Sequence, residues 1–216
     1  RLEQERLTQQ FCRISHLPTN LVSGTIDLDW EGKDKNKQIV FAHMAIDDRF
    51  VDVFQMKLAA GRNFSKQFPA DSSNYILNEE AVRIMGKTPE TAIGQFFRNS
   101  DKKGTIIGVV KDFNFKPLQK KIEPIVLRLV GWGGIVVVRA EQDNTEATIE
   151  ALEKISKELN PAYPFSYGFV DQDLSNLYQN EKQLGNLFNV FAILAIFISC
   201  LGLYGLSAFV AEQRTK

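Results

Sequence analysis

The sequence predicts an α+β domain with mixed sheets that continues into a long helix entering a membrane. Two observations lead to this prediction. Short apolar runs typical of strands alternate with helical segments over most of the chain. Near the carboxyl end, one long tract is apolar and uncharged. No internal repeat or low-complexity linker interrupts this order.

The apolar tract lies between Lys182 and Glu212, where no charged residue occurs. About 20 apolar residues are needed to cross the hydrocarbon core of a bilayer. The alternative is a buried helix of a soluble protein, but such a helix usually keeps a polar face, and this tract has few polar residues. The sequence therefore predicts a transmembrane helix at 184–211, with 212–216 starting a cytoplasmic segment.

The charged residues on either side of this tract predict its orientation. Arg214 and Lys216 follow it closely, whereas Asp171 and Asp173 precede it. Basic residues tend to remain in the cytoplasm. Residues 1–183 are therefore expected outside the cytoplasm.

Small residues recur three or four positions apart within the tract. On a helix they form a stripe against which a second helix can pack closely. The alternative is the ordinary abundance of Gly and Ala in membrane helices, but a lone anchor needs no such stripe, so the pattern favours several membrane helices. The small-residue stripe consists of Ala192, Ala195, Ser199, Gly202 and Gly205.

Composition excludes some classes of protein and gives two further expectations. The 26 basic and 26 acidic residues cancel, which argues against a nucleic-acid partner. Cys12 and Cys200 lie in different settings, with Cys200 inside the apolar tract, so no disulfide is expected. The chain opens at Arg1 without a signal peptide, and we expect it to be part of a longer protein.

Residue patterns assign strands and helices to the rest of the chain. Strands are expected at 21–30, 38–44, 75–77, 104–111, 124–130, 134–139 and 165–170, the first two forming a hairpin. Helices are expected at 2–13, at 47–54 with an Asp cap, at 78–85 between Asn78 and Gly86, and at 144–159. The segment 57–64 is expected to form an edge and turn.

The last helix is expected to be continuous from the domain into the membrane. From Asp173 the pattern is helical, and neither Gly nor Pro interrupts it before Gly185. At 1.5 Å per residue, 30 residues would form a rod of about 45 Å. Such a rod can transmit movement between the domain and the membrane.

No group of residues predicts catalysis, a cofactor or a metal. Residues 86–88 (Gly-Lys-Thr) resemble the end of a phosphate-binding loop, but position 81 is not glycine and a helix precedes them. His43 near Asp47 lacks further His or Cys partners for a metal. The lysines between 102 and 121 are expected to be solvated, with an anionic partner or lipid headgroups as the alternative.

Several segments, taken in order, carry a family resemblance. They are 54–64 (FQMKLAAGRNF), 75–81 (YILNEEA), 107–115 (IGVVKDFNF), 122–124 (IEP), 191–206 and 212–216. Together they resemble the permease subunits of MacB-type ABC transporters, which join a periplasmic core domain to an FtsX-like membrane part, and most closely the versions common in Bacteroidetes-type bacteria. The family-motif turn comprises Asp112, Phe113, Asn114 and Phe115.

The resemblance implies a permease with four membrane helices in the bacterial inner membrane, with residues 1–183 in the periplasm as a two-lobed, mixed-sheet domain. One lobe is discontinuous, about 1–45 and 131–183, and the other is inserted at about 46–130. The implied function couples ATP-driven helix movement to export or extraction of an envelope substrate. The implied partners are a separate or fused cytoplasmic ATPase, a second permease copy and periplasmic or outer-membrane proteins.

Two other functions are considered. A membrane-anchored sensor or adaptor domain would bind a ligand or envelope protein and signal through its helix. An anchored envelope hydrolase would need catalytic residues that the sequence lacks. The small-residue stripe and the family resemblance favour the permease, whose transported substrate is not predicted.

Overall fold

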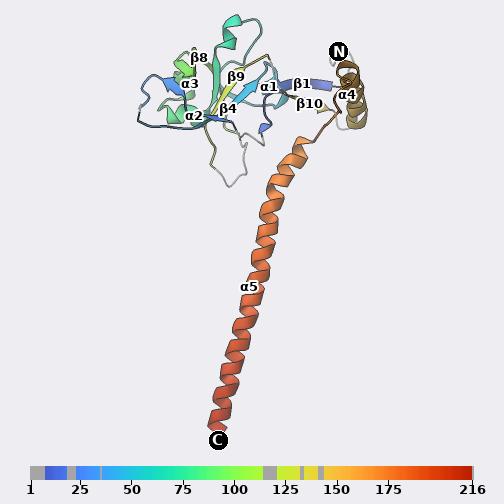
Figure 1. The fold of residues 1–216 in the computed structure, drawn as a ribbon. Helices are drawn as coiled ribbons and strands as arrows, with labels where there is room; N and C mark the ends of the chain where they lie inside the picture. Colours follow the sequence, from blue (N-terminus) through green and yellow to red (C-terminus); the bar gives the residue numbers. More distant parts are fainter. Residues whose placement is uncertain are drawn as a thin grey trace. The chain divides into compact units, whose positions relative to one another are not determined.

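The computed structural model describes residues 8–18, 23–34, 36–113, 121–131, 134–140 and 144–215. The chain divides into two compact units, Arg1–Tyr167 and Gly168–Lys216. The first unit is a mixed α/β domain, and the second consists of one long helix (Figure 1).

The first unit is organised around a mixed β-sheet. Its described strands are β1 (Thr8–Ile14), β2 (Gly24–Thr25), β3 (Leu28–Trp30), β4 (Phe41–Ile46), β5 (Leu58–Gly61), β6 (Tyr75–Asn78), β7 (Phe96–Asn99), β8 (Lys102–Val110), β9 (Ile125–Leu129) and β10 (Ile135–Ala140). They follow the order β10-β1-β4-β9-β6-β8-β7-β3, with β2 beside β4 and β5 beside β8. The β4–β9 and β6–β8 pairs are parallel, and the others are antiparallel.

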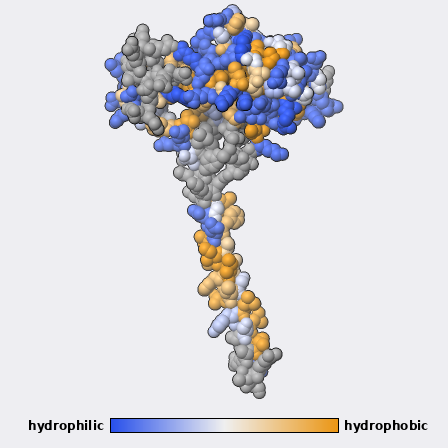
Figure 2. Space-filling view, turned by 180° about the vertical axis from the view of Figure 1, so that it is seen from behind, coloured by the Kyte–Doolittle hydropathy of each residue, from blue (hydrophilic) through white to orange (hydrophobic). Residues whose placement is uncertain are grey.

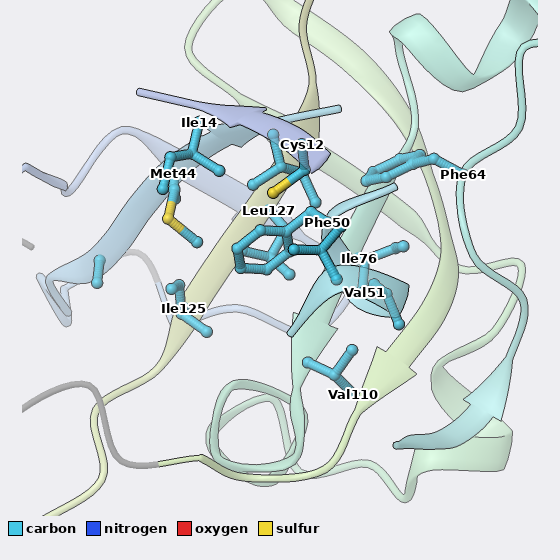
Figure 3. Packing of buried hydrophobic residues seen from close by; sticks show 13 residues of the cluster. Cys12, Ile14, Met44, Phe50, Val51, Phe64, Ile76, Val110, Ile125 and Leu127 are labelled. Carbon is cyan, nitrogen blue, oxygen red and sulfur yellow. The ribbon is translucent and has the colours of Figure 1, made fainter. Parts of the chain in front are cut away.

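One face of the sheet carries a hydrophobic core around the short helix α1 (Phe50–Val53). Phe50 is fully buried, and Cys12 and Met44 belong to the same cluster (Figure 3). A helix of four residues is too short to be stable alone. Burying one large apolar side chain stabilises the fold by about 1.5–3 kcal/mol, so packing against the sheet holds α1 in place.

The opposite face carries a second core, to which α2 (Glu79–Ile84), α3 (Pro89–Ala92) and the strands β3 and β7 contribute. Trp30 stacks on Phe97 at a centroid distance of 6.3 Å. Tyr75 meets Phe97 edge-on at 5.0 Å. All of β6 is buried, because Ile76 packs into the first core and its neighbours pack into the second.

Strands β5 and β8 approach closely at two glycines. Gly61 has a φ of 76°, and a Cβ added there would lie 2.3 Å from the carbonyl oxygen of Ile107. A Cβ on Gly108 would lie 2.4 Å from the carbonyl oxygen of Arg62. Both positions therefore require glycine, and both fall in segments that carry the family resemblance.

The second unit is α5 (Val170–Thr215), a continuous helix of 46 residues. Its segment Leu184–Ser207 is long and apolar enough to cross a membrane, and Figure 2 shows hydrophobic side chains along it. This confirms the predicted continuous helix and places a candidate span within the predicted 184–211.

Several other predictions are confirmed. The strands expected at 75–77, 104–111, 124–130 and 134–139 correspond to β6, β8, β9 and β10. The helices expected at 78–85 and 144–159 correspond to α2 and α4 (Thr145–Leu159). Asn78 caps α2 as predicted, and Gly86 follows it with a φ of 72°.

The helix predicted at 2–13 is wrong where the structure describes it, because residues 8–14 form the strand β1. This strand pairs with β10 along its whole length, joining Phe11 to Val138 and Ile14 to Ile135. Cys12 and Ile14 alternate into the first core. Long-range pairing therefore overrides the helix preference of the Gln and Arg residues in this segment.

The predicted hairpin of 21–30 with 38–44 is only partly correct. Gly24 and Thr25 pair with β4, but the chain then turns away, and Leu28–Trp30 pairs with β7. The burial of Trp30 against Phe97 accounts for this change of partner.

Two further predictions need correction. The strand predicted at 165–170 does not form: Val170 begins α5, and the rings of Phe165 and Tyr167 stack on each other at 5.7 Å. Aromatic alternation alone provides no partner strand. At 47–54 the helix begins later, at Phe50, and Asp47 instead accepts hydrogen bonds from the N–H groups of Arg13 (2.8 Å) and Arg49 (3.1 Å).

Replacing Gly108 with alanine is expected to destabilise the first unit by about 3 kcal/mol, the upper part of the usual overpacking range, because backbone atoms block the added Cβ. Urea unfolding followed by Trp30 fluorescence measures the change. The matched control is Gly131→Ala, where an added Cβ meets nothing within 4 Å. Equal stabilities of the two variants would contradict this interpretation.

Candidate functional site

A buried amide lies where the motif segments of the first unit meet. Asn78 ends β6, caps α2 and is fully buried. Its Oδ1 accepts hydrogen bonds from the N–H groups of Ala81 at 3.0 Å and Ile125 at 2.9 Å. Its Nδ2 donates to the carbonyl oxygen of Glu123 at 3.0 Å. One side chain thus links β6, α2 and the start of β9.

The family-motif turn is tied to the same amide. The Oδ1 atom of Asp112 accepts from Asn78 Nδ2 at 2.9 Å and from the N–H of Glu80 at 3.0 Å. The N–H of Asp112 donates to a carboxylate oxygen of Glu79 at 2.9 Å. We name the set Asn78, Glu79, Glu80 and Asp112 the Asn78 junction. It fixes the end of β8 against the first turn of α2.

The carboxylates of the junction repel one another. Burial raises the pKa of Asp112 above its ordinary 3.8, and the negative charges of Glu79 and Glu80 raise it further, although hydrogen bonds from Glu80 N–H and Asn78 oppose the shift. The first turn of a helix normally favours acidic side chains. Glu79 and Glu80 lie in the first turn of α2, and both also bond to Asp112.

The remainder of the family-motif turn is only partly described. Phe113 packs against the first core, whereas Asn114 and Phe115 lie outside the described residues. The expected turn through 113–117 therefore stays a prediction beyond Phe113. Of the lysines between 102 and 121, Lys102, Lys103, Lys111 and Lys121 are exposed.

A second polar clamp holds the loop that follows β5. The guanidinium of Arg62 donates to both carboxylate oxygens of Asp71, at 2.6 and 2.8 Å. Asp71 is fully buried and also accepts from Ser65 N–H at 3.0 Å and Asn74 Nδ2 at 3.2 Å. The hydrogen bond from Arg62 lowers the pKa of Asp71. Because all four contacts satisfy one carboxylate, this loop is firmly held.

The small-residue stripe lies on α5. All five of its residues are exposed, and an added Cβ at Gly202 or Gly205 would meet nothing within 4 Å. Ser199 Oγ donates to the carbonyl oxygen of Ala195 at 2.8 Å, within its own helix. The stripe is therefore available to a neighbouring helix, and its packing role stays a prediction.

The described residues do not assemble a reactive centre of a familiar kind. No group of three or more His, Cys, Asp or Glu side chains in the described ranges could hold a metal. Residues 86–88 end α2 and lead into α3, where Thr88 and Thr91 form a capping box. The arrangement at this site holds elements together and offers no nucleophile paired with a base.

Two solved structures similar to this one are a periplasmic region and an extracellular domain. The periplasmic region of MacB from Actinobacillus actinomycetemcomitans matches 73% of this chain and 70% of that chain, with a TM-score of 0.52 and 20% identity. The extracellular domain of the noncanonic ABC-type transporter YknZ from Gram-positive bacteria matches 75% and 81%, with a TM-score of 0.55 and 14% identity. The chain has a MacB-type extracytoplasmic fold.

A domain of a Porphyromonas gingivalis protein described as a permease is also similar, over 73% of this chain and 68% of that chain, with a TM-score of 0.51 and 22% identity. At these identities the likeness establishes the fold and not a shared activity. Neither protein-family models nor curated protein sequences match the chain.

Sequence reasoning missed two features of the site. The Arg62–Asp71 clamp joins residues on either side of a loop. The only signal for it in the sequence was the Gly-Arg pair at 61–62. Asn78 also bonds to Ile125 and Asp112. This second role was not predicted, because the capping role already explained why an Asn occurs at this position.

The pH dependence of stability should report the charge repulsion in the Asn78 junction. Because the folded pKa of Asp112 is raised, its contribution to stability is fully present below 3.8 and is lost as pH rises through the folded pKa. Asp112→Asn keeps an oxygen acceptor and removes the charge. The stability of this variant relative to the native chain is therefore expected to increase with pH over that window.

Urea unfolding of both proteins at a series of pH values measures this difference. Asp101→Asn, in an exposed turn, serves as the control and should show no such trend. A stability difference that stays flat with pH for Asp112→Asn would contradict the raised pKa of Asp112.

Enlarging the small-residue stripe should weaken helix packing in the complete protein. Gly202→Leu is expected to lower the melting temperature of the full-length protein in detergent, on the order of 2 °C for a lost contact worth roughly 1 kcal/mol, because a large side chain separates helix axes. Ile193→Leu, an exposed position off the stripe, is the control. Equal melting temperatures would count against the stripe.

Proposed function

We propose that this chain is part of the permease subunit of an ABC transporter in a bacterial inner membrane. The first unit would lie in the periplasm, and Leu184–Ser207 would be the membrane helix that follows it. One observation carries the proposal: a MacB-type extracytoplasmic fold and a candidate membrane span occur together in one chain.

The proposed role of the chain is to relay movement. ATP-driven rearrangement of the membrane helices would move the periplasmic domain and so export or extract an envelope substrate. The continuity of α5 from Val170 supports this role. On the N-terminal side of the apolar segment, α5 extends by about 20 Å at a rise of 1.5 Å per residue. An unbroken helix of this length can pass displacement along its axis.

The other functions of the proposed transporter would belong to other chains or domains. ATP hydrolysis would belong to a cytoplasmic ATPase, separate or fused, and the chain itself would not be catalytic. A second permease copy, identical or different, would complete the assembly, with periplasmic or outer-membrane proteins as further partners. The exposed small-residue stripe of α5 supports contact with at least one other membrane helix.

Purification of the full-length protein tests the transporter assignment. We expect an ABC ATPase to co-purify from detergent-solubilised membranes and to be identified by mass spectrometry. Two further apolar spans after this chain in the complete gene would agree with a permease. A kinase or regulatory module in their place, with no ATPase bound, would instead favour the sensor or adaptor alternative.

A helix break in α5 tests the relay. Leu177→Pro removes one backbone hydrogen bond and costs about 3 kcal/mol within a helix. We expect this variant to retain ATP hydrolysis by the associated ATPase but to lose ATP-dependent movement of the periplasmic domain.

Pulsed electron paramagnetic resonance measures that movement as a change in the distance between spin labels in two copies, attached at Lys154→Cys in a Cys200→Ser background. Leu177→Ala is the matched control and should keep the change. An ATP-dependent distance change that survives in Leu177→Pro would contradict the relay while leaving the transporter assignment intact.

A further inference from the structure

Two basic side chains lie beside a small residue on the face of the sheet that carries the second core, and a third basic residue follows the neighbouring strand β1. Strands β4 and β9 run parallel, with His43 beside Val126 and Ala45 beside Arg128. Because alternate residues of a strand share one face, His43 and Arg128 project on the same side as Val126 of the second core. Ala45 lies between them and contributes only a methyl group.

The third basic side chain comes from the residue pair that follows β1. Ser15 N–H donates to the carbonyl oxygen of Ala45 at 2.9 Å, and Ala45 N–H donates to Ser15 Oγ at 3.0 Å. Ser15 therefore borders Ala45 on the side away from Arg128. His16 follows directly, with its Nδ1 at 2.9 Å from Ser15 Oγ. Ala45 is 3% exposed, so neighbouring side chains cover it.

Among the described residues, no ion pair includes His16, His43 or Arg128. The Nε2 atom of His43 is buried without a hydrogen-bond partner. Burial lowers the pKa of His43, and the charges of Arg128 and His16 lower it further. Unpaired charges and polar atoms away from water are costly.

The groups that face His43 from neighbouring strands are neutral or already bonded. On the β2 side, Ser23 offers its carbonyl oxygen to His43 N–H at 3.0 Å. On β6, the hydroxyl of Tyr75 donates to the carbonyl oxygen of Lys102 at 2.7 Å. At the end of β4, the carboxylate of Asp47 is engaged by two backbone N–H groups. None of these groups neutralises the cluster.

We propose that His16, His43 and Arg128 together form a recess at the surface of this face that binds a small oxyanion, a free phosphate or carboxylate ion. The planar guanidinium of Arg128 would hold two oxygens of the anion. Each imidazole would donate one further hydrogen bond. Arg128 and His43 are partly exposed, which gives the ion a route to the recess. The inference does not depend on the transporter assignment.

The two histidines of the chain make a direct test possible. Histidine labelled with ¹³C at Cε1 is incorporated into the whole chain in detergent, and the signals of His16 and His43 are assigned with single His→Gln variants. Sodium phosphate and sodium acetate are titrated separately at constant ionic strength. We expect a saturable shift of the His43 signal, and a rise of the His43 pKa on binding, because the anion stabilises the imidazolium.

Arg128→Gln is expected to weaken this binding about tenfold, the effect of losing one charged hydrogen-bonding partner. Arg98→Gln is the control, because Arg98 lies on β7, pairs with Asp27 at 3.1 Å and is not part of the recess. Arg128→Lys keeps the charge and serves as a second variant if Arg128→Gln fails to fold, with intermediate affinity expected.

The two probes separate the ligand classes. Saturation by phosphate alone assigns a phosphate site, by acetate alone a carboxylate site, and by both a general oxyanion site. A linear, non-saturating response of His43 to both ions overturns the proposal. The same holds if neither Arg128→Gln nor Arg128→Lys binds more weakly than Arg98→Gln.

Discussion

The side-chain amide of Asn78 is the interaction on which the order of the first unit depends. It is buried between the two cores and satisfies groups from α2, β9 and the turn after β8. An amide can donate and accept at once, and no apolar side chain of similar size could replace it without leaving several buried backbone groups unpaired. The central strands β6, β8 and β9 can therefore meet in only one register near this end of the sheet.

Several residues that carry the family resemblance each have their own structural role in the first unit. Gly61 and Gly108 allow two backbones to approach. Arg62 satisfies the buried carboxylate of Asp71, and Asp112 joins the turn to α2. These are requirements of folding, so the segments that carry the resemblance mark the scaffold here and are not evidence of a binding site.

Features determined by local interactions could be predicted from the sequence, and features determined by distant partners could not. The cap at Asn78, the stop at Gly86 and the helix α4 depend on neighbouring residues, and the structure has them where they were expected. The strand β1 depends on β10, more than a hundred residues later, so its residues were assigned to a helix. Likewise the strand that contains Trp30 pairs with β7, where Trp30 stacks on Phe97. It does not pair with β4, the next strand in the sequence. Of the site, only the capping role of Asn78 was visible in advance.

The two cysteines occupy chemically unequal places. Burial, reinforced by the charge of Asp47, raises the pKa of the Cys12 thiol to about 12, so almost no thiolate exists there at neutral pH, and only thiolates react readily with alkylating reagents. Cys200 is exposed on α5 next to the stripe residue Ser199. The native chain thus carries its own chemical reporter of the membrane. A water-soluble maleimide reaches Cys200 only where the segment Leu184–Ser207 is open to water, so protection of this thiol in intact membranes would show that the segment lies out of water, without any engineered substitution.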